Sequence, residues 1–447
     1  MERTMEEKKQ QLPRKLGLIQ AVALNMIDMV GIGPFVVLAS VIGYMNGPQA
    51  ILAWIAGALL SLLDASVWSE LGAKMPQAGG SYVFLRELYG KDTTIGKLLS
   101  FLLIWQTMIQ APLVLASGAI GFSEYALYLH PFSYWEQKAV AGSVVLIITA
   151  LLYRRIESIG MLSVILWVCV IGTILWLIGS GINNFSANLA FSFNQDSMDL
   201  YSLVFWAGLG QATVKTMYSY LGYYNVCHLG AEIKNPETNI PRSMFISIIG
   251  IALLYCSMHL SIVGVIPWQE AKQSTFVASL FFERIYGHET ALVATGLILI
   301  IAFSSLYAVL LGYSRIPYAA ALDGNFFKIF AKLHPTKNFP YISLISIGAI
   351  GFVFSLLFKL KDVISAILAM RIIVQFIGQA VGLILWKKQH GSETFPWKMW
   401  LYPLPVIIAI LAWIGVFFST GTQFMYGGLI AISLGIIVYF SFLDTKS

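Results

Sequence analysis

Residues 25–37 read NMIDMVGIGPFVV and lie at the centre of a long apolar stretch. The stretch is long enough to cross the roughly 30 Å hydrocarbon core of a bilayer. Near its middle, however, it carries Asp28, Gly31, Gly33 and Pro34. Glycine lets the backbone leave helical geometry, and proline suits the first position of a new helix because no amide hydrogen is needed there. The pattern therefore predicts a membrane helix that is broken at its centre.

The composition of the whole chain indicates an integral membrane protein. Of its 447 residues, 58% are apolar and 11% are charged, and the mean hydropathy is +0.76. Soluble domains carry roughly 25% charged residues. Twelve apolar segments are expected to be transmembrane helices, namely 17–43, 49–71, 98–128, 138–153, 158–181, 200–230, 241–266, 291–320, 341–358, 362–386, 398–418 and 423–442. The sequence predicts an all-α membrane protein with short tails at 1–16 and 443–447.

Lysine and arginine are distributed unevenly among the predicted loops. They concentrate in the N-terminal tail and in the loops after every second segment, as at Arg154, Arg155 and Arg315. Because positively charged loops stay in the cytoplasm, both termini are expected there, in a multi-pass protein of the cell membrane. The basic character of the chain then requires no nucleic-acid partner.

Ionisable side chains inside membrane segments are costly, so they tend to face a cavity or a partner. Asp28 and Asp64 are two of them, and Arg371 is a third. Gln375 and Gln379 follow Arg371 at intervals of four residues, which places all three on one face of a helix. Two interpretations of Arg371 stay open. It is either a structural tie to carbonyls or a buried carboxylate, or part of a gating or proton-linked ion pair with Asp28 or Asp64.

A second long segment is interrupted at YSYLGYYN, residues 218–225. The two breaks occupy corresponding places in two groups of five segments, and such pairs point to the binding site of transporters built from inverted repeats. Amides at the restart of the first helix suit a carboxylate, and carbonyls of the second break suit an ammonium, so the ligand that fits both is an amino acid. The alternative is that the glycines serve close helix packing and the tyrosines serve the core.

Three further motifs resemble those of the amino acid-polyamine-organocation (APC) permeases. They are SELGAKMPQAGGSYVFLRELYG (69–90), GAEIKNPETNIPRS (230–243) and YSRIPYAAALDGNFFKIFAKLHP (313–335). The resemblance extends over almost the whole chain. It implies the five-plus-five inverted-repeat fold called the LeuT fold, with broken helices 1 and 6. The repeats would be 17–181 and 200–386, followed by two additional helices in 398–442.

The resemblance also implies where a substrate binds. Its carboxylate would meet the amides of Ile32 and Gly33, and its amino group would meet carbonyls of the two breaks. Tyr218 would cover the substrate and help to close the outer gate. The candidate substrate-binding residues are Ile27, Asp28, Gly31, Ile32, Gly33, Tyr218, Ser219, Leu221, Gly222 and Tyr223. Asp28, Tyr218 and Arg371 are the candidates for coupling or gating.

The chain departs from the family at two positions that concern coupling. Several proton-coupled or sodium-independent members carry a lysine in helix 5, where Val170 stands here. Sodium-coupled members place hydroxyls in helix 8, where Val309 and Leu310 align and the nearest hydroxyls are those of Ser304 and Ser305. The alignment argues weakly against sodium.

Asp28 is then the ionisable side chain nearest the predicted site. One hypothesis is that Asp28 takes up and releases a proton during transport. The competing hypothesis is that Asp28 permanently braces the unwound segment or pairs with Lys215 or Arg371.

Together, these features predict a secondary transporter that moves an amino acid by alternating access, either proton-coupled or as an exchanger. A neutral substrate is favoured because Asp28 is the only acid near the site. The alternatives are a polyamine or other amine transporter of the same fold, and a membrane sensor that binds an amino acid without transporting it. No phosphate-binding loop, metal cluster or catalytic triad pattern is found, so neither an enzyme nor a cofactor or metal is expected. The protein is expected to be a monomer or a weak homo-oligomer.

Overall fold

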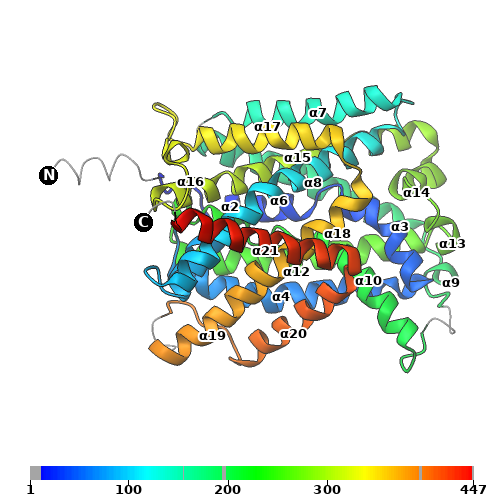
Figure 1. Cartoon of the computed structure of the whole chain (residues 1–447). Coiled ribbons are helices and arrows are strands. Elements are labelled where there is room, and N and C mark those ends of the chain that lie inside the picture. Colours follow the sequence, from blue (N-terminus) through cyan, green and yellow to red (C-terminus); the bar gives the residue numbers. More distant parts are fainter. Residues whose placement is uncertain (1–11, 155, 194–197, 392–394, 445–447) are drawn as a thin grey trace.

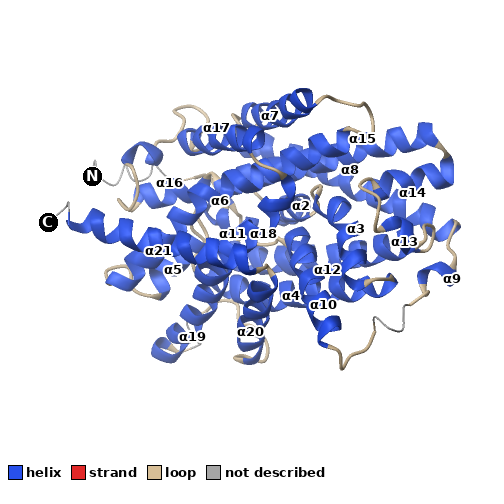
Figure 2. Ribbon diagram, turned by 45° about the vertical axis from the view of Figure 1, so that its right-hand side comes forward, coloured by secondary structure: helices blue, strands red, loops and turns tan. Residues whose placement is uncertain are grey.

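The computed structural model describes residues 12–154, 156–193, 198–391 and 395–444. The predicted tails at 1–16 and 443–447 lie mostly outside these ranges. Figure 2 shows helices and loops, and the described ranges contain no strand. Two isolated backbone bridges join Leu16 to Ile233 and Ala78 to Leu229. The prediction of an all-α protein is confirmed.

The first half of the chain forms helices that follow the predicted segments closely. They are α2 (Leu18–Met29), α3 (Gly33–Met45), η1 (Pro48–Ala50), α4 (Ile51–Lys74), α5 (Ser81–Leu88), α6 (Thr94–Ala126), α7 (Tyr134–Leu151), α8 (Ile156–Asn183), α9 (Ala187–Ala190), α10 (Leu203–Tyr220), α11 (Asn225–His228) and η3 (Gly230–Glu232).

The second half continues in the same way. Its helices are α12 (Pro236–Val263), α13 (Trp268–Ala271), α14 (Val277–Tyr286), α15 (His288–Tyr313), α16 (Arg315–Leu322), η4 (Lys328–Ala331), α17 (Tyr341–Leu357), α18 (Leu360–Arg371), the π-helical η5 (Ile372–Ile377), α19 (Gly378–His390), α20 (Leu404–Ser419) and α21 (Thr422–Asp444).

All twelve predicted segments correspond to helices. In the described part of the chain, seven helices are long and apolar enough to cross a membrane, and α2 with α3 makes an eighth span, bent by 47°. Of the others, α17 and α20 are shorter apolar helices, and α7 and α10 have 18 residues each. α20 begins at Leu404, later than the predicted 398, because Pro403 and Pro405 fit the cap and first turn of a helix but not its interior.

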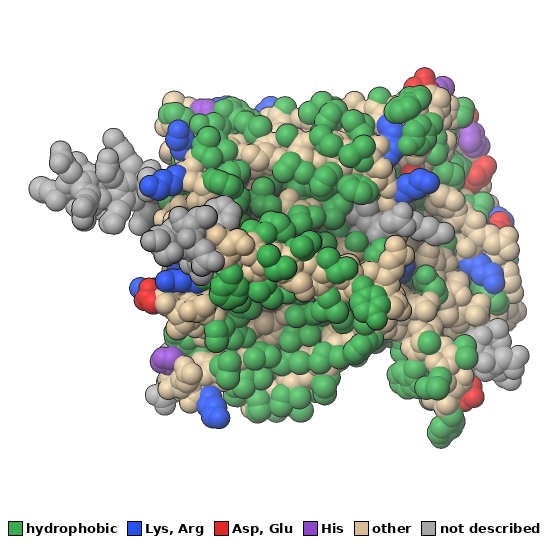
Figure 3. Space-filling view, in the orientation of Figure 1, with side chains coloured by type: hydrophobic (Ala, Val, Ile, Leu, Met, Phe, Trp, Pro, Cys, Tyr) green, Lys and Arg blue, Asp and Glu red, His purple; other side chains and the backbone are tan. Residues whose placement is uncertain are grey.

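The helices form one bundle and run side by side in Figure 1. α12 packs against α2, α4 and α8, and α15 packs against α6 and α8. The described chain begins and ends at the left of the view, and α9, α13 and α14 lie at the right. Figure 3 shows a broad hydrophobic surface between two margins that carry the charged side chains. This distribution is what a lipid-facing surface requires, because charges are costly in hydrocarbon.

A buried ion pair holds the end of the bundle where the described chain begins. The Arg315 guanidinium donates to both carboxylate oxygens of Glu232, at 2.8 and 3.2 Å, and both side chains are almost completely buried. The Glu232 carbonyl accepts hydrogen bonds from the amides of Lys15 and Leu16, each 2.9 Å long. The segment that enters α2 is thereby attached to the segment that follows the second break.

We expect Glu232→Gln to destabilise the protein markedly. Removing one partner of a buried ion pair leaves the other charge uncompensated, which costs about 3–5 kcal/mol. Thermal unfolding of the purified protein, followed by intrinsic fluorescence, measures the effect. Glu237→Gln is the matched control, because Glu237 is exposed in the first turn of α12. Equal melting temperatures for the two variants would contradict the stabilising role of the pair.

Candidate functional site

The helix breaks lie next to each other at the centre of the bundle. The first separates α2 from α3 at residues 30–32, and the second separates α10 from α11 at residues 221–224. Gly222 in the second break has a φ of +124°, and a Cβ there would lie 2.8 Å from Cγ of Asp28. A side chain at this position would therefore meet both backbone strain and a clash. Gly222 allows the two unwound segments to touch.

Side chains from neighbouring helices satisfy part of the unwound backbone. The Tyr255 hydroxyl of α12 lies 2.8 Å from the carbonyl oxygen of Met29 and 3.1 Å from that of Ser219, so it joins the two breaks. Asn25 accepts a hydrogen bond from the amide of Val226 at 3.0 Å. These contacts fix the relative position of α2, α10 and α11.

The start of α3 leaves backbone donors free. In the part of the chain that the structure describes, the amides of Ile32 and Gly33 donate to no acceptor, whereas the amide of Gly31 bonds to the carbonyl of Met29 at 3.1 Å. Pro34 is the second residue of α3, one position later than predicted. Free amides and the positive end of the helix dipole together favour an anion.

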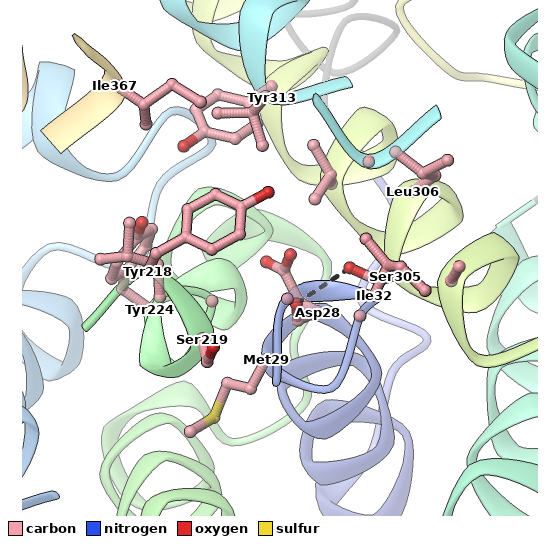
Figure 4. Close-up of a pocket in the computed structure, with 18 of the residues that line it drawn as sticks. Asp28, Met29, Ile32, Tyr218, Ser219, Tyr224, Ser305, Leu306, Tyr313 and Ile367 are labelled. Atoms are coloured by element: carbon pink, nitrogen blue, oxygen red, sulfur yellow. Dashed lines mark hydrogen bonds between the residues drawn. The ribbon is translucent and has the colours of Figure 1, made fainter. Parts of the chain in front are cut away.

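A cavity of about 50 Å³ lies between the two breaks. One water needs about 10–15 Å³ by this measure, so the space suits roughly four waters. Figure 4 shows the labelled side chains around it, with the Asp28 side chain pointing into the space between them. The cavity is lined by eight of the ten candidate residues, namely Asp28, Gly31, Ile32, Gly33, Tyr218, Ser219, Leu221 and Gly222, and by Arg371. Their binding of a substrate remains a prediction.

The remaining two candidates, Ile27 and Tyr223, are placed elsewhere. Ile27 is fully buried in the hydrophobic core and does not line the cavity. The Tyr223 hydroxyl donates to the carboxylate of Asp64, which also accepts from the indole of Trp413 at 3.1 Å. Tyr223 thus serves a buried hydrogen-bond network between α4, the second break and α20.

Arg371 has partners that neither interpretation of the sequence included. Its guanidinium donates to the hydroxyls of Tyr224 and Tyr313 and to the Gln375 side chain, the last at 3.0 Å. The guanidinium carbon also lies 5.1 and 5.3 Å from the centres of the two tyrosine rings, within range of cation–π attraction. Within the described residues, the Arg371 guanidinium donates to no carbonyl and no carboxylate, although it lines the same cavity as Asp28.

Asp28 and Arg371 are the charged side chains among the residues that line the cavity. The Asp28 carboxylate has no hydrogen-bond donor and no ion-pair partner within the described residues, and Arg371 acts on it through space. A carboxylate of this kind is available to a ligand. The cavity therefore offers a small polar molecule backbone amide donors, the carboxylate of Asp28 and the guanidinium of Arg371.

Several lining residues did not appear among the sequence candidates. Ser305 in α15 donates a hydrogen bond to the carbonyl of Asp28 at 3.1 Å, drawn in Figure 4, and it lies one helical turn before the aligned Val309. Tyr224 and Tyr313 line the cavity as well. The four-residue period of a helix points to Ser305 once Val309 is placed near the site, but nothing local in the sequence singles out Tyr313.

The fold and this cavity define a class of protein, a multi-span helical membrane protein with a central cavity between two broken helices. The chain belongs to the amino acid permease family, whose profile matches residues 16–442. Members of this family are permeases, in agreement with the expectation that the chain is not an enzyme. The predicted resemblance to APC permeases is confirmed.

Three relatives illustrate the range of the family. The chain is 25% identical to the cationic amino acid transporter 4 of Mus musculus over 85% of its own length and 61% of that relative's length. It is 24% identical to the serine/threonine exchanger SteT of Bacillus subtilis, with 98% of both chains covered. It is 22% identical to the branched-chain amino acid permease BcaP of the same bacterium, over 96% of this chain and 93% of the relative.

We expect Gly222→Ala to destabilise the protein, because a side chain at φ +124° is strained and would clash with Asp28. Backbone strain of this kind costs about 1–3 kcal/mol before the clash is counted. Thermal unfolding of the purified variants is the measurement. Gly43→Ala is the control, since a Cβ at Gly43 in α3 meets nothing within 4 Å. The close approach would be refuted by equal stability of the two variants.

Proposed function

We propose that this protein is a secondary transporter that moves a small neutral amino acid across the cell membrane by alternating access. The observation that carries the proposal is the pair of unbonded amides, Ile32 and Gly33, at the start of α3 beside the central cavity. Buried donors without an acceptor are costly, and a substrate carboxylate satisfies both. The helix dipole adds to this attraction.

The positively charged ammonium group of the substrate would also find partners in the cavity. The carboxylate of Asp28, which has no bonded partner among the described residues, attracts an ammonium group, and carbonyl oxygens of the helix turns beside the breaks are further acceptors. The Asp28 and Ser219 carbonyls already accept hydrogen bonds from Ser305 and Tyr255. Each carbonyl oxygen retains a second lone pair, so these atoms can still accept from an ammonium.

A neutral side chain is favoured by the charge balance and the size of the cavity. Asp28 and Arg371 bring one charge of each sign, and the volume of about 50 Å³ leaves little space for a long side chain. Two of the relatives are named for serine and threonine and for branched-chain amino acids, which are neutral. The name of a third, a cationic amino acid transporter, keeps a basic amino acid as an alternative.

Two other functions make different predictions for the same site. A transporter of polyamines or other amines would not need the free amides of Ile32 and Gly33, because its substrate lacks a carboxylate. A membrane sensor would bind the amino acid without moving it. Transport into sealed vesicles separates the sensor from both transporters.

We further infer the arrangement of the chain in the membrane from its sequence and family. Residues 17–181 and 200–386 would form the two inverted repeats, with 398–442 added, and both termini would face the cytoplasm. The ion pair of Glu232 with Arg315 then closes the cytoplasmic side. Tyr218, whose hydroxyl lies 2.9 Å from that of Ser117 in α6, is the candidate gate on the outer side.

Ligand-induced thermal shifts test the substrate class. Purified protein is screened against the twenty amino acids, polyamines and monoamines, with and without sodium. We expect small neutral amino acids to raise the melting temperature, since a ligand at 100 times its Kd stabilises the folded state by about 2.7 kcal/mol. Analogues with an amidated carboxylate should give no shift, because they cannot satisfy the amides of α3.

Two variants show whether the shift arises from the central cavity. Gly31→Ala places a Cβ 2.5 Å from the Ser305 hydroxyl oxygen and should abolish the shift, whereas Gly43→Ala should retain it. A shift with polyamines alone would support the amine transporter. If no amine-bearing compound changes the melting temperature, the proposed substrate class is wrong.

We also propose that Asp28 couples transport to protons. Its carboxylate lacks a bonded partner within the described residues, lies in the substrate cavity and is influenced by Arg371. A carboxylate that was fixed by donors on all sides would instead brace the structure, as Asp64 does between Tyr223 and Trp413. Asp28 is thus able to exchange a proton when the cavity opens.

We expect Asp28→Asn to weaken substrate binding, because the ammonium group loses its carboxylate, and to lose accumulation against the gradient even at substrate concentrations that restore occupancy. Proteoliposomes with an imposed pH gradient and radiolabelled substrate provide the measurement. Asp92→Asn, in the exposed loop before α6, is the control for loss of an acid and should accumulate substrate normally. An Asp28→Asn protein with unchanged, equally pH-dependent accumulation would rule out this role.

A further inference from the structure

A second hollow lies on the surface of the bundle, separate from the central cavity. It is a cleft of about 680 Å³ between the first turns of α6, the last turns of α21 and the loop that joins α16 to α17. Lys97 and Lys328 line it together with aromatic side chains that include Phe101, Trp105 and Tyr439. The cleft is at the end of the bundle where α21 ends, the left of Figure 1.

The charge in this cleft has one sign. Lys97 and Lys328 are both exposed, and they are the charged residues among those that line the cleft. Asp323, which precedes the lining residue Gly324, lies close by but forms an ion pair with Arg86. The cleft therefore presents two ammonium groups that the nearby acid does not neutralise.

The inner wall of the cleft is apolar and is formed by side chains packed between α6 and α21. The rings of Phe101 and Tyr439 pack with their centres 5.4 Å apart, which joins α6 to α21. The Trp105 indole donates a hydrogen bond to the carbonyl of Ala431 at 3.0 Å. A Cβ at Gly435 would lie 2.8 Å from the Trp105 ring, so this glycine brings α21 close to α6. The wall is thus fixed from both helices.

The surroundings of the cleft are typical of the border between lipid and water. Only 17% of the apolar part of the span Thr422–Ser441 in α21 is buried in the protein, so α21 is largely exposed on the bundle surface. The loop beside Lys328 exposes Phe327 by 63% and Ile329 by 51%. Exposed aromatic and basic residues at the end of a membrane span are characteristic of the interfacial region. The apolar side of the cleft is therefore of the kind that lipid chains contact.

We propose that this cleft binds an anionic phospholipid. The phosphate of the headgroup lies between Lys97 and Lys328, and an acyl chain follows the wall formed by Phe101, Trp105 and Tyr439. Basic residues beside a membrane attract anionic headgroups, and the aromatic wall replaces contacts that the chain makes in the bilayer. In the orientation predicted from the lysines and arginines, the lipid belongs to the cytoplasmic leaflet. The assignment is independent of the transported substrate.

Native mass spectrometry of the full chain in detergent tests this proposal. Phosphatidylglycerol, phosphatidylcholine and inorganic phosphate are titrated separately against the protein. We expect phosphatidylglycerol to bind in preference to phosphatidylcholine. Lys97→Gln with Lys328→Gln should weaken phosphatidylglycerol binding about 30-fold, because each lysine near an anionic lipid contributes about fivefold.

The matched control is Lys91→Gln with Lys332→Gln, which removes two exposed lysines that do not line the cleft. Its affinity for phosphatidylglycerol should equal that of the unaltered protein, and Lys97→Arg with Lys328→Arg should retain binding. Thermal unfolding of every variant verifies that it is folded.

Three results would overturn the assignment. They are equal loss of phosphatidylglycerol in the cleft and control variants, equal binding of phosphatidylcholine, and binding of inorganic phosphate as tight as that of the lipid. Loss of binding on Phe101→Ala, with unchanged thermal unfolding, would in contrast support the acyl-chain contact, because this change leaves both lysines in place.

Discussion

The hydroxyl of Tyr255 makes the contact on which the centre of this bundle depends. It lies within hydrogen-bond distance of one carbonyl just before each break, those of Met29 and Ser219. In hydrocarbon there is no water to satisfy unwound backbone, so a membrane helix can stop and restart only where protein supplies partners or the backbone lines a cavity. α12 brings Tyr255 to both breaks, and the cavity forms between them.

The same constraint explains why hydrogen-bond donors and acceptors are distributed unevenly around the cavity. Carbonyls in the last turns of α2 and α10, just before the breaks, have hydroxyl donors within the protein, namely Tyr255 and Ser305. The amides of Ile32 and Gly33 have no acceptor in the part of the chain that the structure describes. One wall of a small cavity therefore offers donors without an acceptor among the described residues. This asymmetry, together with an Asp28 carboxylate that has no bonded partner in the described part of the chain, is the physical basis for the proposed recognition of an amino acid.

Basic side chains serve different purposes at different depths of the protein. Arg371 is buried at the cavity, where two tyrosine hydroxyls, their rings and Gln375 surround it. Arg315 is buried near the end of the bundle and is neutralised by Glu232. Lys97 and Lys328 remain exposed at the surface, beside an apolar wall. A buried cation needs partners inside the protein, whereas an exposed one is available to a lipid headgroup.

The membrane class, the helical segments and both breaks can be predicted from the amino-acid sequence, because hydropathy, glycine and proline act locally along the chain. Which side chains meet across the breaks depends on how the helices pack. The Tyr223 hydroxyl bonds to Asp64 and the Arg371 guanidinium to two tyrosines, contacts that the sequence does not indicate, whereas the roles of both residues at the site remain predictions. Neighbours along the chain do not encode these contacts. They follow from how α4, α10, α12, α15 and α18 pack around the unwound backbone, which must find its partners wherever the bundle places them.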